Sequence, residues 1–256
     1  MTPEFVVILL GLTLVAFLYS SVGHGGASGY LAILSLTSYA SMSNEWLKQT
    51  AWCLNLVVAA IAFHHYRKAG HHNPSLTIPF IVTSIPAAFL GGMMVVNDVL
   101  YDTLLSFILI WAAIRIVQGV GVELENEVKT PPKSIAMSSG VGIGTISGII
   151  GVGGGIFLSP LLILRGWGTA KTVAATSAIF IWVNSFSGLL GVLARGGLNL
   201  EVSILGPFAV CVVFGGVLGA KFGAGDSSQY TIRKLLAIVL ILAALRRTLG
   251  VLGLWG

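Results

Sequence analysis

Long apolar stretches separated by short polar breaks make up almost the whole chain. These stretches fall at residues 5–22, 27–40, 46–64, 75–96, 99–118, 134–150, 155–164, 170–194, 202–222 and 231–250. A helix needs about 20 residues to cross the hydrocarbon core of a bilayer, and most of the stretches approach that length. Two of them, 27–40 and 155–164, are clearly shorter. The pattern predicts an all-α polytopic membrane protein.

The composition excludes a soluble fold. The chain has 256 residues, of which 55% are hydrophobic and 9% charged, and its mean hydropathy is +0.93. A soluble domain carries about 25% charged residues, so most of this surface must face lipid. In a soluble chain the net charge of +5 would suggest a nucleic-acid partner, but basic residues in membrane loops set topology instead. We therefore expect a surrounding lipid bilayer and no nucleic acid.

A glycine-rich turn precedes each of the two short stretches, and the two turns match. The aligned pairs are Gly23 with Gly151, Gly25 with Gly153, Gly26 with Gly154, Thr50 with Thr176, Gly70 with Gly196, and Asn73 with Asn199. Such self-similarity indicates a tandem duplication. We predict one membrane repeat over residues 1–118 and a second over 134–256. Residues 119–133 form the polar, helix-breaking linker between them.

The distribution of basic residues favours two repeats of inverted topology. If the first two stretches of each repeat form a glycine-broken hairpin, three spanning helices remain per repeat, and an odd number inverts the second repeat. The basic residues then divide into ten on one side and four on the other, the four being Lys48, Arg195, Arg246 and Arg247. Four full spans per repeat would divide them eight to six. Because cytoplasmic loops are rich in Lys and Arg, we predict a cytoplasmic linker and extracytoplasmic termini.

The two glycine turns form the candidate substrate site. Non-helical backbone survives at membrane depth only where it is buried in protein or lines a wet cavity. Each turn precedes a short helix, whose first N–H groups and positive dipole end favour an anion. Paired, glycine-interrupted segments are typical of a transporter's site near the bilayer midplane. The candidate binding residues are Gly23, His24, Gly25, Gly26, Gly151, Gly153, Gly154 and Gly155. The alternative is that these glycines only allow close helix packing.

Uncharged polar side chains inside the apolar stretches supply further candidates. These are Thr50, Asn55, Thr176, Ser177 and Asn184. Neutral hydrogen-bond donors suit an anion that must also be released. Their alternative role is hydrogen bonding between helices, which we expect for Ser185 and Ser187. No Asp, Glu, Lys or Arg lies well inside a predicted span, which argues against a carboxylate-based ion relay.

The histidines permit several interpretations. His24 lies within the first turn and could carry a proton or a positive charge for the anion, or it could only hydrogen-bond the turn. The run from His64 to His72 has no nearby cysteine or carboxylate, so we interpret it as a lipid-anchoring loop and not as a metal site. We predict no catalytic residue, metal or cofactor, because no nucleophile paired with a base and no nucleotide-binding loop is evident.

At these residues the sequence resembles the sulfite exporter TauE/SafE family. The resemblance runs from Tyr19 to Arg247 and rests on the duplicated glycines, the helix containing Ala175, Thr176, Ser177 and Asn184, and the later glycines Gly70 and Gly196. It implies a small transporter of the bacterial inner membrane that exports sulfite, sulfonates or related sulfur oxyanions. The first repeat departs from the pattern at His24 and at Thr50 to Asn55, where the spacing is five residues instead of eight.

The residues favour a secondary transporter for a small anion, and the resemblance implies an inorganic or organosulfur anion. An anion channel would share the same site but show neither saturation nor exchange. A membrane partner or receptor subunit without transport activity would tolerate substitutions in the glycine turns. The exact substrate, the coupling ion and the formation of a homodimer stay open at this point.

The predicted topology can be tested with a tag at each terminus. Both tags should be accessible to a membrane-impermeant reagent in spheroplasts with an intact inner membrane, because an even number of net crossings leaves both ends outside. A tag in the linker, between residues 119 and 133, is the internal control and should stay protected. Protection of either terminal tag would contradict the assignment.

Overall fold

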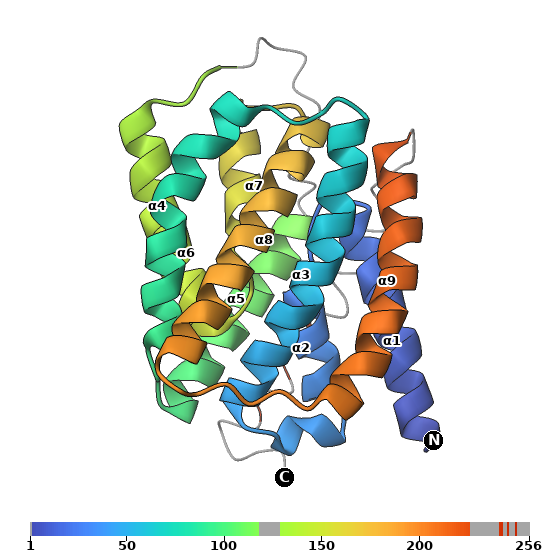
Figure 1. Cartoon of the computed structure of the whole chain (residues 1–256). Coiled ribbons are helices and arrows are strands. Elements are labelled where there is room, and N and C mark those ends of the chain that lie inside the picture. The colour runs from blue at the N-terminus through green and yellow to red at the C-terminus, as the bar shows by residue number, and fades with distance from the viewer. Residues whose placement is uncertain (1, 118–128, 226–240, 243–244, 246–248, 250–256) are drawn as a thin grey trace.

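The computed structural model describes residues 2–117 and 129–225, together with residues 241, 242, 245 and 249 (Figure 1). Its helices are α1 (Pro3–Ser20), α2 (Ala27–Ser35), the 3-10 helix η1 (Ser38–Ser41), α3 (Asn44–Lys68), α4 (Pro74–Met93), α5 (Asp98–Val117), α6 (Lys133–Ile150), α7 (Gly155–Leu164), α8 (Ala170–Ala194) and α9 (Val202–Ala224). No strand occurs within the described residues. The all-α prediction is confirmed.

In the part of the chain that the structure describes, five helices are long and apolar enough to cross a membrane, namely α1, α3, α4, α8 and α9. Large apolar side chains point outward from several of them: Leu10 on α1 is 66% exposed, Val82 on α4 58% and Val210 on α9 70%. Such surfaces are unfavourable in water and suit contact with lipid. The chain is therefore a multi-pass membrane protein.

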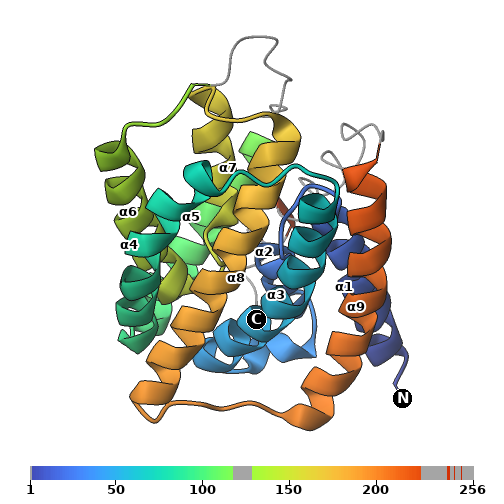
Figure 2. The same cartoon turned by 45° about the horizontal axis from the view of Figure 1, so that its top comes forward.

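The helices form one bundle in which the two predicted repeats interleave (Figures 1 and 2). The long helices α3 and α8 contact each other, while α1 packs against α9 and α4 packs against α6. Each of these contacts joins a helix of the first predicted repeat to a helix of the second. Neither repeat therefore builds its own separate core.

The short helices α2 and α7 have only 9 and 10 residues and turn back inside the bundle. In Figure 1, α1 begins at the lower end, where the N-terminus is marked, whereas α6 begins at the upper end. The two hairpins thus enter from opposite ends, as inverted repeats require. The repeat relation itself stays a prediction. Residues 119–128 of the predicted linker and nearly all of the stretch 231–250 lie outside the described residues.

Two rows of glycines allow the closest helix contacts. Along α9, Gly215, Gly219 and Gly223 lie against the carbonyl oxygens of Thr13 and Phe17 of α1 and of Ser21, its C-terminal cap. Along α6, Gly140, Gly144 and Gly148 lie against the carbonyl oxygens of Phe80, Ser84 and Ala88 of α4. A Cβ atom at any of these six positions would collide with backbone. Glycines four residues apart thus bring the paired helices into direct contact, as small residues do in membrane proteins.

Two glycines of α6 provide a matched test of this packing. A Cβ on Gly144 would lie 2.6 Å from the carbonyl oxygen of Ser84, whereas a Cβ on Gly142 would meet nothing within 4 Å. We expect Gly144→Ala to destabilise the fold by about 1–3 kcal/mol through overpacking. Gly142→Ala should be neutral or slightly stabilising, because alanine favours helix. Thermal unfolding in detergent measures both, and equal melting temperatures for the two variants would contradict the contact.

Candidate functional site

Each short helix is preceded by a glycine whose backbone has a conformation that only glycine adopts easily. Gly26 immediately precedes α2 with φ of 100°, and Gly154 immediately precedes α7 with φ of 81°. These left-handed conformations strain any L-residue with a Cβ. The two glycines are aligned in the predicted repeats. The chain reverses direction at both points, which directs the first turns of α2 and α7 into the middle of the bundle.

The two turns lie against the same pair of side chains, Asn55 of α3 and Ile181 of α8. A Cβ on Gly25 would collide with the Asn55 amide and lie 3.0 Å from Cγ2 of Ile181. A Cβ on Gly153 would lie 2.7 Å from Asn55 Nδ2 and 2.8 Å from the same Cγ2 methyl of Ile181. The turns, which are more than a hundred residues apart in sequence, therefore meet where α3 and α8 pack together.

Asn55 connects the first turn to the second half of the chain. Its Oδ1 accepts a hydrogen bond from the backbone N–H of Ala27 at 2.9 Å, and its Nδ2 donates to Oγ of Ser185 at 3.2 Å. The side chain is completely buried. Asn55 thus provides a partner for one of the free N–H groups that begin α2. The Ser185 contact is the hydrogen bond between helices that we expected for that residue.

The start of α7 lacks an equivalent polar cap. Ile181 occupies the position aligned with Asn55 and packs its apolar side chain against Gly155. Within the described part of the chain, the backbone N–H groups of Gly155 and Ile156 make no hydrogen bond. The N–H groups of Ser28 and Gly29 at the start of α2 likewise make no described hydrogen bond, so the two helix starts differ in the Asn55 cap on Ala27. A negatively charged ligand would be favoured at the α7 end of the site.

A chain of polar side chains runs from the first turn to α7 and α8. His24 Nδ1 donates to the carbonyl oxygen of Val22 at 2.9 Å, since a carbonyl only accepts. Its Nε2 lies 3.2 Å from Oγ of Ser159 on α7, which in turn lies 2.7 Å from Oγ of Ser177 on α8. His24 and Ser159 are half-buried, whereas Ser177 is fully buried. A neutral His24 accepts from Ser159, and a protonated one would donate to it.

The structure does not bring all of the remaining predicted site residues together. Thr176 shares a hydrogen bond with Thr77 of α4 at 3.1 Å, and the structure describes no hydrogen bond from Thr50 to either turn. Asn184 is fully buried, and both of its side-chain polar atoms lack a partner in the described structure. An unsatisfied buried amide costs about 1–3 kcal/mol. Asn184 is therefore the predicted residue with the most unused hydrogen-bonding capacity.

Comparison with known proteins shows the family to which the chain belongs. The family model for the sulfite exporter TauE/SafE matches residues 7–247. The chain belongs to this family. It is 32% identical over 249 residues to "Probable membrane transporter protein y4hK" of Sinorhizobium fredii, covering 96% of this chain and 99% of that protein.

A second relative of this TauE/SafE member comes from Methanocaldococcus jannaschii and is also described as a probable membrane transporter protein. It is 23% identical over 273 residues, covering 98% of this chain and 96% of the relative. No solved structure matches the chain. Both relatives are described as probable membrane transporters, which agrees with the expectation of a transporter.

Sequence reasoning missed several polar residues close to the turns. Ser159 was overlooked because it is a single hydroxyl in an apolar stretch. Lys48 was counted as a loop cation, yet it lies inside α3, and its Cγ would be 2.6 Å from a Cβ on Gly151. A cation only a few residues inside an apolar stretch was the available signal. Among the described residues, no group of three or more His, Cys, Asp or Glu side chains could hold a metal ion.

Replacement by leucine should lower the stability of the protein at Asn55 but not at Asn184. Asn55→Leu leaves the Ala27 N–H without its partner, so we expect a loss of about 1–3 kcal/mol in unfolding free energy. Asn184→Leu removes two unpartnered polar atoms and should leave stability unchanged or higher. Melting temperatures of the ligand-free protein in detergent compare the two variants. A larger loss at Asn184 than at Asn55 would refute this assignment of partners.

Proposed function

We propose that this protein is a secondary transporter that exports a small sulfur oxyanion, sulfite or a related sulfonate, from the bacterial cytoplasm across the inner membrane. The observation that carries the proposal is the meeting of the two glycine turns on Asn55 and Ile181. Membership of the sulfite exporter TauE/SafE family supports the transport activity and the class of substrate. An anion at this meeting point would face two helix starts at once.

The substrate would be held mainly by main-chain donors and uncharged side chains. The free N–H groups at the start of α7 attract an anion without introducing a fixed charge. Asn184 offers an unpartnered amide, and Ser177 and Ser159 offer hydroxyl groups next to His24. Neutral hydrogen bonds are individually modest, so such a site can bind an anion and still release it. Rocking of one part of the bundle against the other would then alternate access to the two sides.

The arrangement of described cations supports export toward the end of the bundle that carries the N-terminus. Most of them lie at the opposite end: Arg67 and Lys68 end α3, Lys133 begins α6, Arg165 follows α7, Lys171 lies in the first turn of α8, and Lys221 lies in the last turn of α9. Lys48 and Arg195 lie at the N-terminal end. The positive-inside rule makes the cation-rich end cytoplasmic.

The membrane potential supplies enough energy for export without a coupled ion. An inside-negative potential drives an anion outward with about 2.3 kcal/mol per charge per 100 mV. This mechanism requires no carboxylate inside the membrane. The alternative is proton coupling through His24, whose ring connects the first turn to Ser159. A flux that follows an imposed pH gradient but ignores voltage would favour that alternative.

Two glycines of equal backbone conformation provide the decisive experiment. Gly153 has φ of 72° and faces Asn55, whereas Gly196 has φ of 73° and would accept a Cβ with nothing within 4 Å. In proteoliposomes, voltage-driven sulfite flux should fall at least about tenfold in Gly153→Ala, because the methyl group displaces the central amide. Gly196→Ala introduces the same backbone strain and should transport nearly normally.

Counterflow in the same vesicles separates a transporter from its alternatives. A transporter exchanges labelled for unlabelled sulfite and saturates, whereas a channel does neither. A wild-type protein without sulfite or sulfonate flux would contradict the proposed function. So would equal fluxes in the two glycine variants, provided that both remain folded.

A further inference from the structure

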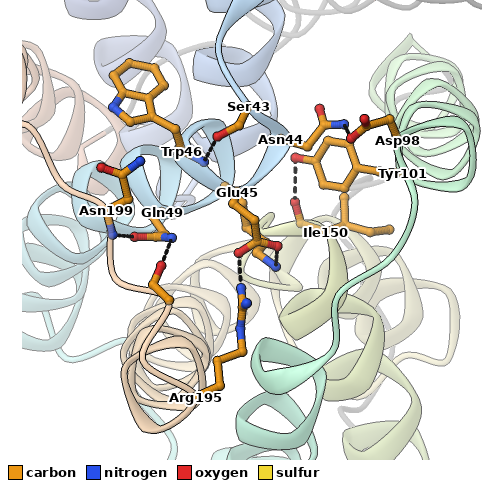
Figure 3. A network of polar contacts seen from close by, with 12 residues as sticks. Ser43, Asn44, Glu45, Trp46, Gln49, Asp98, Tyr101, Ile150, Arg195 and Asn199 are labelled. Atoms are coloured by element: carbon orange, nitrogen blue, oxygen red, sulfur yellow. Dashed lines mark hydrogen bonds and ion pairs between the residues drawn. The ribbon is translucent and has the colours of Figure 1, made fainter.

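A cluster of charged side chains joins α3 to α8 at the end of the bundle that carries the N-terminus (Figure 3). Glu45, in the first turn of α3, accepts a hydrogen bond from Lys48 Nζ through Oε1 at 2.9 Å. Its other oxygen, Oε2, pairs with the guanidinium group of Arg195, the residue that caps α8. One carboxylate thus bridges two cations that come from different halves of the chain.

The two cations of the cluster share one bridging carboxylate. Lys48 and Arg195 share Glu45, and the nearby carboxylate of Asp98 accepts instead from Asn44 at 2.8 Å. Arg195 Nε is buried and has no hydrogen-bond partner in the described structure. Two cations with a single carboxylate between them, and one donor still unused, form a place where a further anion would be stabilised.

Lys48 connects this cluster to the second glycine turn. Its side chain is 1% exposed, and its aliphatic part packs directly on Gly151. Its ammonium group lies 5.5 Å from the centre of the Trp52 ring, one turn further along α3. Glu45 and Arg195 are 30% and 20% exposed. The charged side chains therefore extend from the glycine turn to the partly exposed Glu45 and Arg195 at this end of the bundle.

The same end of the bundle is closed by Gln49. Its Nε2 donates to the carbonyl oxygen of Gly197 at 2.9 Å, and its Oε1 accepts from the N–H of Asn199 at 2.7 Å. Figure 3 shows Gln49, Glu45 and Arg195 reaching across the gap between α3 and the segment after α8. These contacts hold the two halves together where an anion from the glycine turns would have to leave.

Among the described residues, the opposite end of the α3 and α8 pair has no equivalent. In the alignment that pairs Thr50 with Thr176, the counterparts of Glu45, Lys48 and Gln49 are Lys171, Ala174 and Ala175. The two alanines are buried with Tyr66 in a small apolar cluster. Within residues 2–117 and 129–225, the charged closure thus belongs to one end. A feature that served only to hold a symmetric bundle together would be expected at both ends.

We propose that Glu45, Lys48 and Arg195 form an exit site for the transported anion, in which the oxyanion takes the place of the Glu45 carboxylate between the two cations. The inference rests on the proposed function and deepens it. When the anion binds, the bridge from α3 to α8 through Glu45 is released and this end can open. When Glu45 returns, it competes with the anion for the same cations, which lowers the affinity and promotes release.

Removing the negative charge of Glu45 and removing the positive charge of Lys48 should change the anion affinity in opposite directions, which tests this competition. Isothermal titration calorimetry with sulfite, sulfate and thiosulfate on the full-length protein in detergent gives the dissociation constants. Glu45→Gln should lower the dissociation constant about tenfold, because the anion no longer competes with a carboxylate. Lys48→Gln should raise it about tenfold, because a charged partner is lost. Arg195→Gln tests the second cation and replaces the Lys48 variant if that protein does not fold.

Two exposed residues provide matched controls. Glu201→Gln removes a carboxylate at the same end of the bundle, and Lys133→Gln removes an ammonium group at the other end; both should leave the dissociation constants unchanged. A structural ion pair alone would weaken binding, or leave it unaltered, in both the Glu45 and the cation variants. That pattern would overturn the exit site, as would the absence of anion binding to the wild-type protein.

Flux measurements distinguish this inference from the proposed function. If wild-type vesicles transport sulfite but Glu45→Gln and Lys48→Gln do not shift affinity in opposite directions, the exit site is wrong and export stands. If wild-type vesicles do not transport sulfur oxyanions, export is wrong. Opposite shifts in affinity would then still support an anion site at Glu45, Lys48 and Arg195.

Discussion

The need to satisfy backbone hydrogen bonds inside a membrane is the constraint on which this structure depends. Helices satisfy their own N–H and C=O groups, but a break in a helix leaves several without partners, and lipid offers none. Here the N–H group of Ala27, at the break before α2, donates to Oδ1 of Asn55. The carbonyl oxygen of Gly25 accepts from the hydroxyl group of Tyr30. The break before α7 has no such side-chain partner, because Ile181 occupies the position aligned with Asn55. Two breaks from aligned positions have therefore become chemically different.

The close packing of glycines makes this meeting of the turns sterically feasible. The glycines of α9 lie on the backbone of α1, and those of α6 lie on the backbone of α4. Each pair couples one half of the chain to the other, so the hairpins cannot shift independently of the long helices beside them. Because interiors are close-packed, a small displacement in one pair must be accommodated by its neighbours. That coupling is what alternating access by rocking would require.

Polar interactions are distributed unevenly along the central pair α3 and α8. Their midpoint carries the uncharged side chains of Asn55 and Ser185, which hydrogen-bond to each other without the desolvation cost of a charged group. One end carries the bridge from Glu45 to Arg195, and the other end carries small apolar residues. Charges near a helix end remain partly hydrated, so they can exchange partners at lower cost than charges at mid-membrane. The uneven distribution gives the site a direction that a symmetric duplication alone would lack.

The sequence by itself determined the helical membrane fold and the glycine turns. Hydrophobic length and the exclusion of charge from lipid specify helices locally, and glycine is needed where a backbone must turn sharply. Which residues meet across the bundle was decided only by the tertiary structure. Asn55 reached both turns as its position suggested, but Thr176 paired with Thr77, and Ile181 filled the place aligned with Asn55. The grouping of Lys48 with Arg195 could not be read from sequence, because it depends on how α3 crosses α8, and that crossing is set by packing of side chains far apart in the chain.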